Sequence, residues 1–143
     1  MDILGAMDIG YSALKAQTTR LNTIGSNLAN METTRTPEGG PYQKKSVVFE
    51  SGEKGFAGQL DKSRRDMSSG VNVSRIMSDQ GEGKQVYEPS HPDADDEGYV
   101  VKPDISLVEE MTDMMNAKGS YEANVTTIKS AQSMAMSALE IGR

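Results

Sequence analysis

The feature that most constrains this fold is a seven-residue spacing of apolar side chains at both ends of the chain. Near the N-terminus Met7, Leu14, Leu21 and Leu28 recur every seven residues, and Ile24 belongs to a second row at spacings of three and four. This is the a/d stripe of a coiled-coil helix. It predicts one helix from near the first residue to about residue 30.

The C-terminal segment repeats the scheme. Alternate steps of four and three from Leu107 give apolar residues at most positions, including Met111, Met114, Tyr121, Val125, Ile128 and Leu139. Glu109 and Glu110 fall in the first turn, where the helix dipole favours acidic side chains. Pro103 stands just upstream, where a helix can begin but not continue. The pattern predicts a helix from about residue 105 to the end.

A helix of that length cannot lie inside its own globule. At 1.5 Å per residue it spans about 58 Å, whereas a compact domain of this size is only about 37 Å across. The N-terminal helix can cover about three quarters of it. Only four charged residues occur in 1–30 and eight in 105–143, fewer than solvated helices usually carry. We therefore expect further copies or homologous chains to complete the burial of both stripes.

The residues between the N-terminal apolar positions are poor helix formers. They are small and polar: Asn22, Thr23, Gly25, Ser26, Asn27 and Asn30. Such residues cost several tenths of a kcal/mol each relative to Ala, and Gly costs about 1 kcal/mol. The isolated segment should therefore be largely unfolded and become helical on docking. Small polar side chains also let helices approach closely and form sideways hydrogen bonds.

The middle of the chain has a different character. "YQKKSVVFE" and "GVNVSRIMS" are typical of strands, and the Gly, Ser and charge-rich stretch 51–70 between them is expected to be a loop or long hairpin tip. "QVYEPSHPDADDEGYVVKP" predicts an irregular connection with a short strand at each end. The fold class is α+β: long terminal helices paired as an α-helical coiled coil, with a small irregular β-hairpin middle segment. We divide the chain into 1–33, 34–104 and 105–143.

Little in the sequence indicates catalysis or a cofactor. There is no Cys, and the single histidine, His91, lies in a Pro-flanked loop. Asp93, Asp95, Glu97, Gly98 and Asp104 partly fit a calcium-loop template, but position 12 lacks Glu and Pro103 intrudes. No membrane span or Sec-type signal peptide is evident. The net charge of -6 argues against a nucleic-acid partner. We expect no enzyme activity, cofactor, metal or small-molecule substrate.

Several motifs resemble the flagellar axial proteins, the rod and hook subunits. "SNLANMET" (26–33) is similar to their N-terminal signature, and "YEPSHPDADDEGYV" (87–100) and "SYEANV" (120–125) resemble the proximal rod subunits among them. The resemblance implies a structural subunit of the proximal rod, which assembles helically through its terminal helices, transmits torque and forms the wall of the export channel. It implies the periplasmic rod of the flagellar basal body as the location, and export without a cleaved signal peptide.

The implied partners are other copies, proximal and distal rod subunits, the adaptor joining the rod to the export gate, and the flagellar type III export apparatus. "FAGQL" (Phe56 to Leu60) fits a loose export-signal pattern. Pattern and resemblance together give these candidate assembly residues: Met7, Leu14, Leu21, Ile24, Ser26, Asn27, Leu28, Asn30, Met111, Met114, Tyr121, Asn124, Val125, Ile128 and Leu139. The alternative is an export chaperone or adaptor built on an intramolecular helical hairpin.

Overall fold

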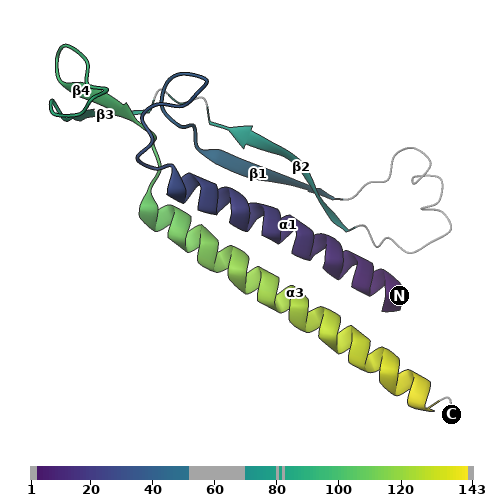
Figure 1. Ribbon diagram of the computed structural model, residues 1–143. Coiled ribbons are helices and arrows are strands. Elements are labelled where there is room, and N and C mark those ends of the chain that lie inside the picture. The colour runs from purple at the N-terminus through teal and green to yellow at the C-terminus, as the bar shows by residue number, and fades with distance from the viewer. Residues whose placement is uncertain (1–2, 52–69, 80, 82, 142–143) are drawn as a thin grey trace, which may run out of the picture.

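The computed structural model describes residues 3–51, 70–79, 81 and 83–141. Two helices form its long axis: α1 (Ile3–Ala29) and α3 (Leu107–Ile141). The middle segment contributes four strands, β1 (Lys45–Ser51), β2 (Val71–Ser78), β3 (Lys84–Tyr87) and β4 (Tyr99–Lys102). The expected α+β class, with paired terminal helices and a small β middle segment, is confirmed (Figure 1). The described helices are not long and apolar enough to cross a membrane.

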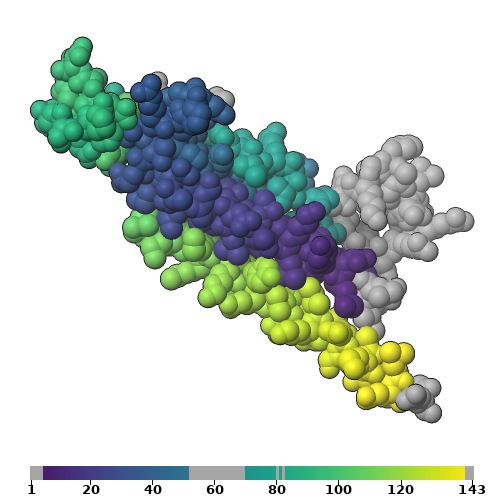
Figure 2. Space-filling model, viewed as in Figure 1, coloured from purple at the N-terminus to yellow at the C-terminus, as the bar shows by residue number. Residues whose placement is uncertain are grey.

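Helix α1 is the central layer of the molecule. It packs antiparallel against α3 on one side and against the β1–β2 hairpin on the other (Figure 1). The β3–β4 hairpin lies at one tip of the elongated molecule, and the end of α3 lies at the other (Figure 2). The apolar residues that the described part buries are few and mostly small: Ala16, Ile24, Val100, Ala117 and Ala131.

Small side chains let α1 and α3 approach closely. Gly10 faces Ile128 so tightly that a Cβ added at Gly10 would lie 2.7 Å from Ile128 Cγ1. Ala16, Ala117 and Ala131 are at most 5% exposed. The close positions are thus occupied by Gly and Ala, whereas the sequence pattern predicted that small polar residues would bring the helices together.

The face of α3 that meets α1 coincides with the predicted stripe at Met114, Tyr121 and Ile128, and it is one residue out of phase with the stripe at the positions between them. Glu110, Ala117 and Ala131 are buried, whereas Leu107, Met111 and Leu139 are exposed. One residue turns the helix by about 100°, so the predicted row mixed two faces. The row on the α1 side is Glu110, Met114, Ala117, Tyr121, Asn124, Ile128, Ala131 and Ala135.

The two predicted strands, β1 and β2, form an antiparallel pair. Val47 pairs with Ile76 and Phe49 with Val73, and the register shifts between Val48 and Phe49. Ser74 is thus the extra residue of a β-bulge. The bulge places Val73 and Ile76 on the same face despite their odd separation, so both share the side of Val47 and Phe49.

The second sheet confirms the prediction of short strands at both ends of the 85–103 stretch. Tyr87 and Tyr99 pair across it with ring centroids 5.3 Å apart, in an edge-to-face arrangement. Gly98 adopts φ +83°, which an L side chain rarely does, and it lies against the Tyr87 ring. Lys102 binds Glu88 at 2.7 Å and Glu32 at 3.1 Å, which ties this sheet to the segment after α1.

The stretch predicted as a loop or hairpin tip, 51–70, falls almost wholly outside the described residues. The export-signal candidate, Phe56 to Leu60, also lies outside them.

Candidate assembly interface

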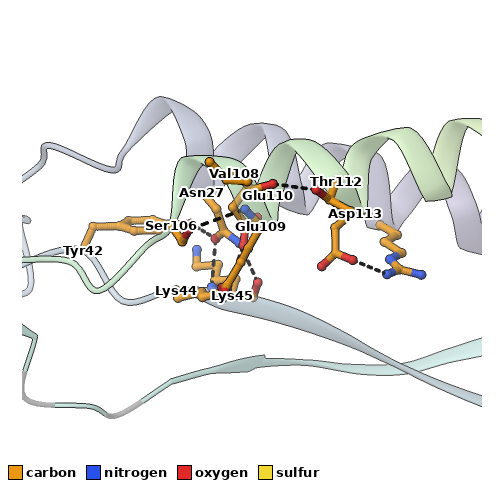
Figure 3. Close-up of polar contacts among 11 residues, drawn as sticks. Asn27, Tyr42, Lys44, Lys45, Ser106, Val108, Glu109, Glu110, Thr112 and Asp113 are labelled. Atoms are coloured by element: carbon orange, nitrogen blue, oxygen red, sulfur yellow. Dashed lines mark hydrogen bonds and ion pairs between the residues drawn. The ribbon is translucent and has the colours of Figure 1, made fainter.

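Asn27 is buried where α1, the chain entering β1 and α3 meet (Figure 3). Its side chain is 1% exposed. Its amide donates to the Lys45 carbonyl at 2.8 Å and to Glu110 Oε2 at 3.1 Å. Its Oδ1 accepts from the Lys45 backbone N–H at 2.9 Å and from the Tyr42 hydroxyl at 3.1 Å. One side chain of the "SNLANMET" motif thus fixes the relative position of three segments.

Glu110 is the second buried polar side chain of this junction. It is 2% exposed, and its Oε1 lies 2.9 Å from Lys44 Nζ. The hydrogen bond with Glu110 raises the pKa of Lys44 above its ordinary value of 10.5. Breaking a buried pair by removing one partner typically costs about 3–5 kcal/mol, because the other charge is left uncompensated. The first turn of α3 therefore needs the segment before β1 in place to pack on α1.

Other residues of the motif end α1. Asn30 donates from its side chain to the Ser26 carbonyl at 2.8 Å, and its Oδ1 accepts from the Thr33 hydroxyl. Ser26 Oγ lies 3.2 Å from the Tyr42 hydroxyl. Farther along, Arg20 pairs with Asp113 at 3.2 Å, but both side chains are a third or more exposed. Such an exposed pair contributes about 1 kcal/mol or less.

Large apolar side chains remain exposed on α3. Val108, Met111 and Met115, which we call the outer patch, are 73%, 47% and 70% exposed. Near the other end of the helix, Met134, Met136 and Leu139 are 60–75% exposed. These six residues form two separate groups of exposed apolar side chains, one toward each end of α3.

The candidate assembly residues fall into three groups by burial. Ile24 and Asn27 are buried, and Met111 and Leu139 are exposed. The others are half-buried: Met7, Leu14, Leu21, Ser26, Leu28, Asn30, Met114, Tyr121, Asn124, Val125 and Ile128.

Sequence reasoning missed Glu110 and Lys44 as members of the junction. Little in the sequence points to this role of Glu110, because a Glu in the first turn of a helix is ordinarily exposed to solvent.

The acidic loop uses its carboxylates in turns. Asp95 Oδ1 accepts from the backbone N–H groups of Glu97 and Tyr99, and Asp93 Oδ2 accepts from the Thr34 hydroxyl. His91 Nδ1 accepts from the Asp93 N–H at 3.1 Å. Within the described ranges, no group of three or more His, Cys, Asp or Glu residues could hold a metal ion. These contacts give the acidic loop and its histidine structural roles.

Comparisons with known proteins define the class of this chain. The family model described as "Flagella basal body rod protein" matches residues 7–35, which cover most of α1 and the Asn27 motif. The model described as "Flagellar basal body rod FlgEFG protein C-terminal" matches residues 96–141, which cover β4 and α3. The helix pair thus matches the flagellar basal-body rod proteins.

Whole-chain relatives define the family more closely. The flagellar basal-body rod protein FlgC of Bacillus subtilis is 39% identical, with all of both chains covered. FlgC of Salmonella typhimurium is also 39% identical over the whole of both chains. FlgC of Borreliella burgdorferi is 38% identical over 99% of this chain and 98% of the relative. The chain belongs to the FlgC family, and it is a structural subunit of the flagellar basal-body rod.

Proposed function

We propose that the subunit builds the proximal rod through the outer faces of its α1–α3 pair. The observation that carries the proposal is the outer patch, where Val108, Met111 and Met115 are 47–73% exposed. Fully burying one such side chain contributes about 1.5–3 kcal/mol. Association that covers the patch on many chains would therefore supply free energy that a single chain does not gain.

The partners proposed for these faces are other copies, proximal and distal rod subunits, and the adaptor between the rod and the export gate. Units 1–33 and 105–143 form the assembling layer, and 34–104 packs outside it. The subunit reaches the periplasmic rod through the flagellar type III apparatus without a cleaved signal peptide. It transmits torque, lines the export channel and catalyses no reaction.

We further propose that folding and assembly are coupled. Within the described residues, the buried apolar side chains of the helix pair are Ile24 and three alanines. The stability of a folded protein is a small difference between large opposing free-energy terms. The burial of so few side chains contributes little free energy to offset the conformational entropy that is lost when two long helices become ordered. The isolated chain should therefore have low helix content, which rises when partners are added.

The test places a charge in the outer patch. Met115→Asp adds a carboxylate at a 70% exposed position, so it should leave the α1–α3 seam intact but resist burial between subunits. Asn116→Asp, the control, adds the same charge at the next exposed position, about 100° around the helix. Met115→Asp should abolish motility and rod assembly while export continues. Motile cells with complete rods would refute an assembly role for the outer patch.

A further inference from the structure

Helix α1 keeps one row of exposed side chains that no other described element covers. Its partners among the described elements are α3, β1 and β2. The exposed residues between 5 and 20 recur at steps of three, four and three, which places them on one side of the helix. We call these residues the outer row of α1: Asp8, Tyr11, Lys15 and Thr18. Tyr11 is 69% exposed, so this side of α1 is open to a partner.

Helix α3 carries a second row with the same steps. Its partner among the described elements is α1 alone. The outer row of α3 consists of four exposed residues: Gly119, Glu122, Thr126 and Lys129. Gly119 lies two positions beyond the buried Ala117, or about 160° around the helix from the seam. A Cβ added at Gly119 would meet no atom within 4 Å, so a side chain from another chain has room there.

Charge fixes the direction and the register in which the two rows match. Asp8 and Lys15 are seven residues apart, and so are Glu122 and Lys129. When the helices run antiparallel with Asp8 opposite Lys129, Lys15 falls opposite Glu122. Among the described residues of α3, no other register in either direction sets both charges of the α1 row opposite exposed residues of opposite charge. Complementary charges of this kind favour one partner surface and one register.

The neighbouring charges leave this match intact. On the side of α3 that faces the hairpin, Lys44 and Arg20 pair with the acids near its start: Glu109, Glu110 and Asp113. Lys118 lies 3.8 Å from Glu122 on the same helix, and the two side chains are 70% and 66% exposed. An exposed pair of this kind contributes little to stability, and it leaves Glu122 able to accept a second lysine.

The register that charge selects is also the register of the helix pair within one subunit. There Gly10 lies against Ile128, and Asn27 binds Glu110. Counting along both helices from these two contacts places Lys15 level with residues 122–123. A second α1 would therefore lie along the far side of α3 at the level of the subunit's own α1. The charge match and the seam thus agree on one arrangement of neighbouring subunits.

We propose that the outer row of α1 in one copy packs antiparallel on the outer row of α3 in a second copy, with Asp8 beside Lys129 and Lys15 beside Glu122. The proposal rests on the assembly function above and names surfaces that carry it. Because the two rows are different surfaces of one subunit, the contact is heterologous. Its repetition produces a wall of alternating helices, which closes into a ring or continues as an open helix.

The chain has no Cys, so introduced thiols report this contact directly. A Thr18→Cys/Gly119→Cys double variant, in basal bodies isolated from motile cells and then oxidised, should give a ladder of covalent multimers. Mass spectrometry should find residue 18 linked to residue 119. An intrachain bond is excluded, because the two positions lie on outward sides of adjacent helices, roughly 12–14 Å apart. A disulfide spans only about 7 Å between Cα atoms.

The matched control tests the register. Thr18→Cys/Thr126→Cys moves one thiol seven residues along the same row, which is about 10 Å, and should give several-fold less multimer. Each single-Cys variant should remain monomeric.

Charge reversal tests the pairing without introduced thiols. Glu122→Lys should lower motility several-fold, because Lys15 of the neighbouring copy then meets a like charge. Adding Lys15→Glu should restore motility, and it would not do so if Glu122→Lys acted only within α3. Glu140→Lys reverses a charge beyond the outer row and should leave motility unchanged.

Complete rods without an 18–119 link would overturn the proposed contact and leave the rod function standing. Equal yields from the two double-Cys variants would overturn the register, and failure of Lys15→Glu to restore motility would overturn the charge pairing. Linkage of residue 18 or 119 to a different rod protein would overturn the assignment to a second copy. If the unaltered chain is absent from isolated rods, the proposed function itself fails.

Discussion

Replacing Asn27 with Ala should weaken folding and assembly together, because this residue joins three segments. The variant loses four hydrogen bonds, one of them to the buried Glu110 carboxylate. A neutral bond contributes about 1 kcal/mol net, a bond to a charged group about 1.5–3 kcal/mol, and unpaired buried groups add to the cost. We expect a total loss of roughly 3 kcal/mol or more.

The assay follows from the coupling of folding to assembly. Far-UV circular dichroism against chain concentration gives the concentration at which helix content is half-maximal. A loss of about 1.4 kcal/mol changes an equilibrium tenfold, so Asn27→Ala should raise this concentration by about a hundredfold or more.

Asn22→Ala is the matched control, since Asn22 lies on the exposed side of the same helix. It should change the midpoint by less than about threefold, toward lower concentration, because Ala is the better helix former. Equal midpoints for the two variants would refute the role given to the buried junction.

Three further predictions test the same account. Leu21→Asp places a charge on a half-buried position of α1 and should abolish motility while synthesis of the protein continues. If cells with this variant still swim, the apolar stripe of α1 that contains Leu21 is not an assembly surface. Gly10→Ala should destabilise the helix pair by about 1–3 kcal/mol through overpacking, and adding Ile128→Ala, which removes the two side-chain atoms nearest the new methyl group, should relieve the overpacking. In an assay of rod thermal stability, no effect of Gly10→Ala would contradict the close approach. The raised pKa of Lys44 means that its pair with Glu110 contributes stability below pH 10.5, a contribution lost as the pH rises through the higher folded-state value. The stability deficit of Lys44→Met in assembled rods should therefore be full at neutral pH and shrink above pH 10.5; a deficit independent of pH would contradict this pairing.

The two helices could be predicted from spacing, but the face that α3 turns to α1 could be predicted only in part. Met111 and Leu139 are large and apolar, so the sequence pattern places them in the seam, whereas the structure places Ala117 and Ala131 there. The seam uses small residues because the helices lie close together. The spacing of apolar residues in the sequence does not by itself distinguish the α3 side chains that pack on α1 from those that stay exposed on the subunit.

The junction was predictable in part. The resemblance pointed to Asn27, but its partner Glu110 is 83 positions away in sequence and looks like a solvated first-turn acid. The strands of the hairpin were expected from their β-branched residues. The bulge at Ser74 was not, since it depends on how β2 must turn Val73 and Ile76 toward the same side.

The central claim is that the exposed apolar faces of α3 are covered by other subunits in the rod. Methionine oxidation, read by mass spectrometry, tests it directly, because Met115 and Met136 are 70% and 60% exposed in the single chain. In assembled rods both methionines should oxidise at least about tenfold more slowly than in the free chain. A tenfold change corresponds to about 1.4 kcal/mol, so it is expected if burial between subunits contributes at least that free energy. Met77 on β2 is the internal reference and should stay reactive in both states. Equal reactivity of Met115 and Met136 in free chain and rod would contradict the account.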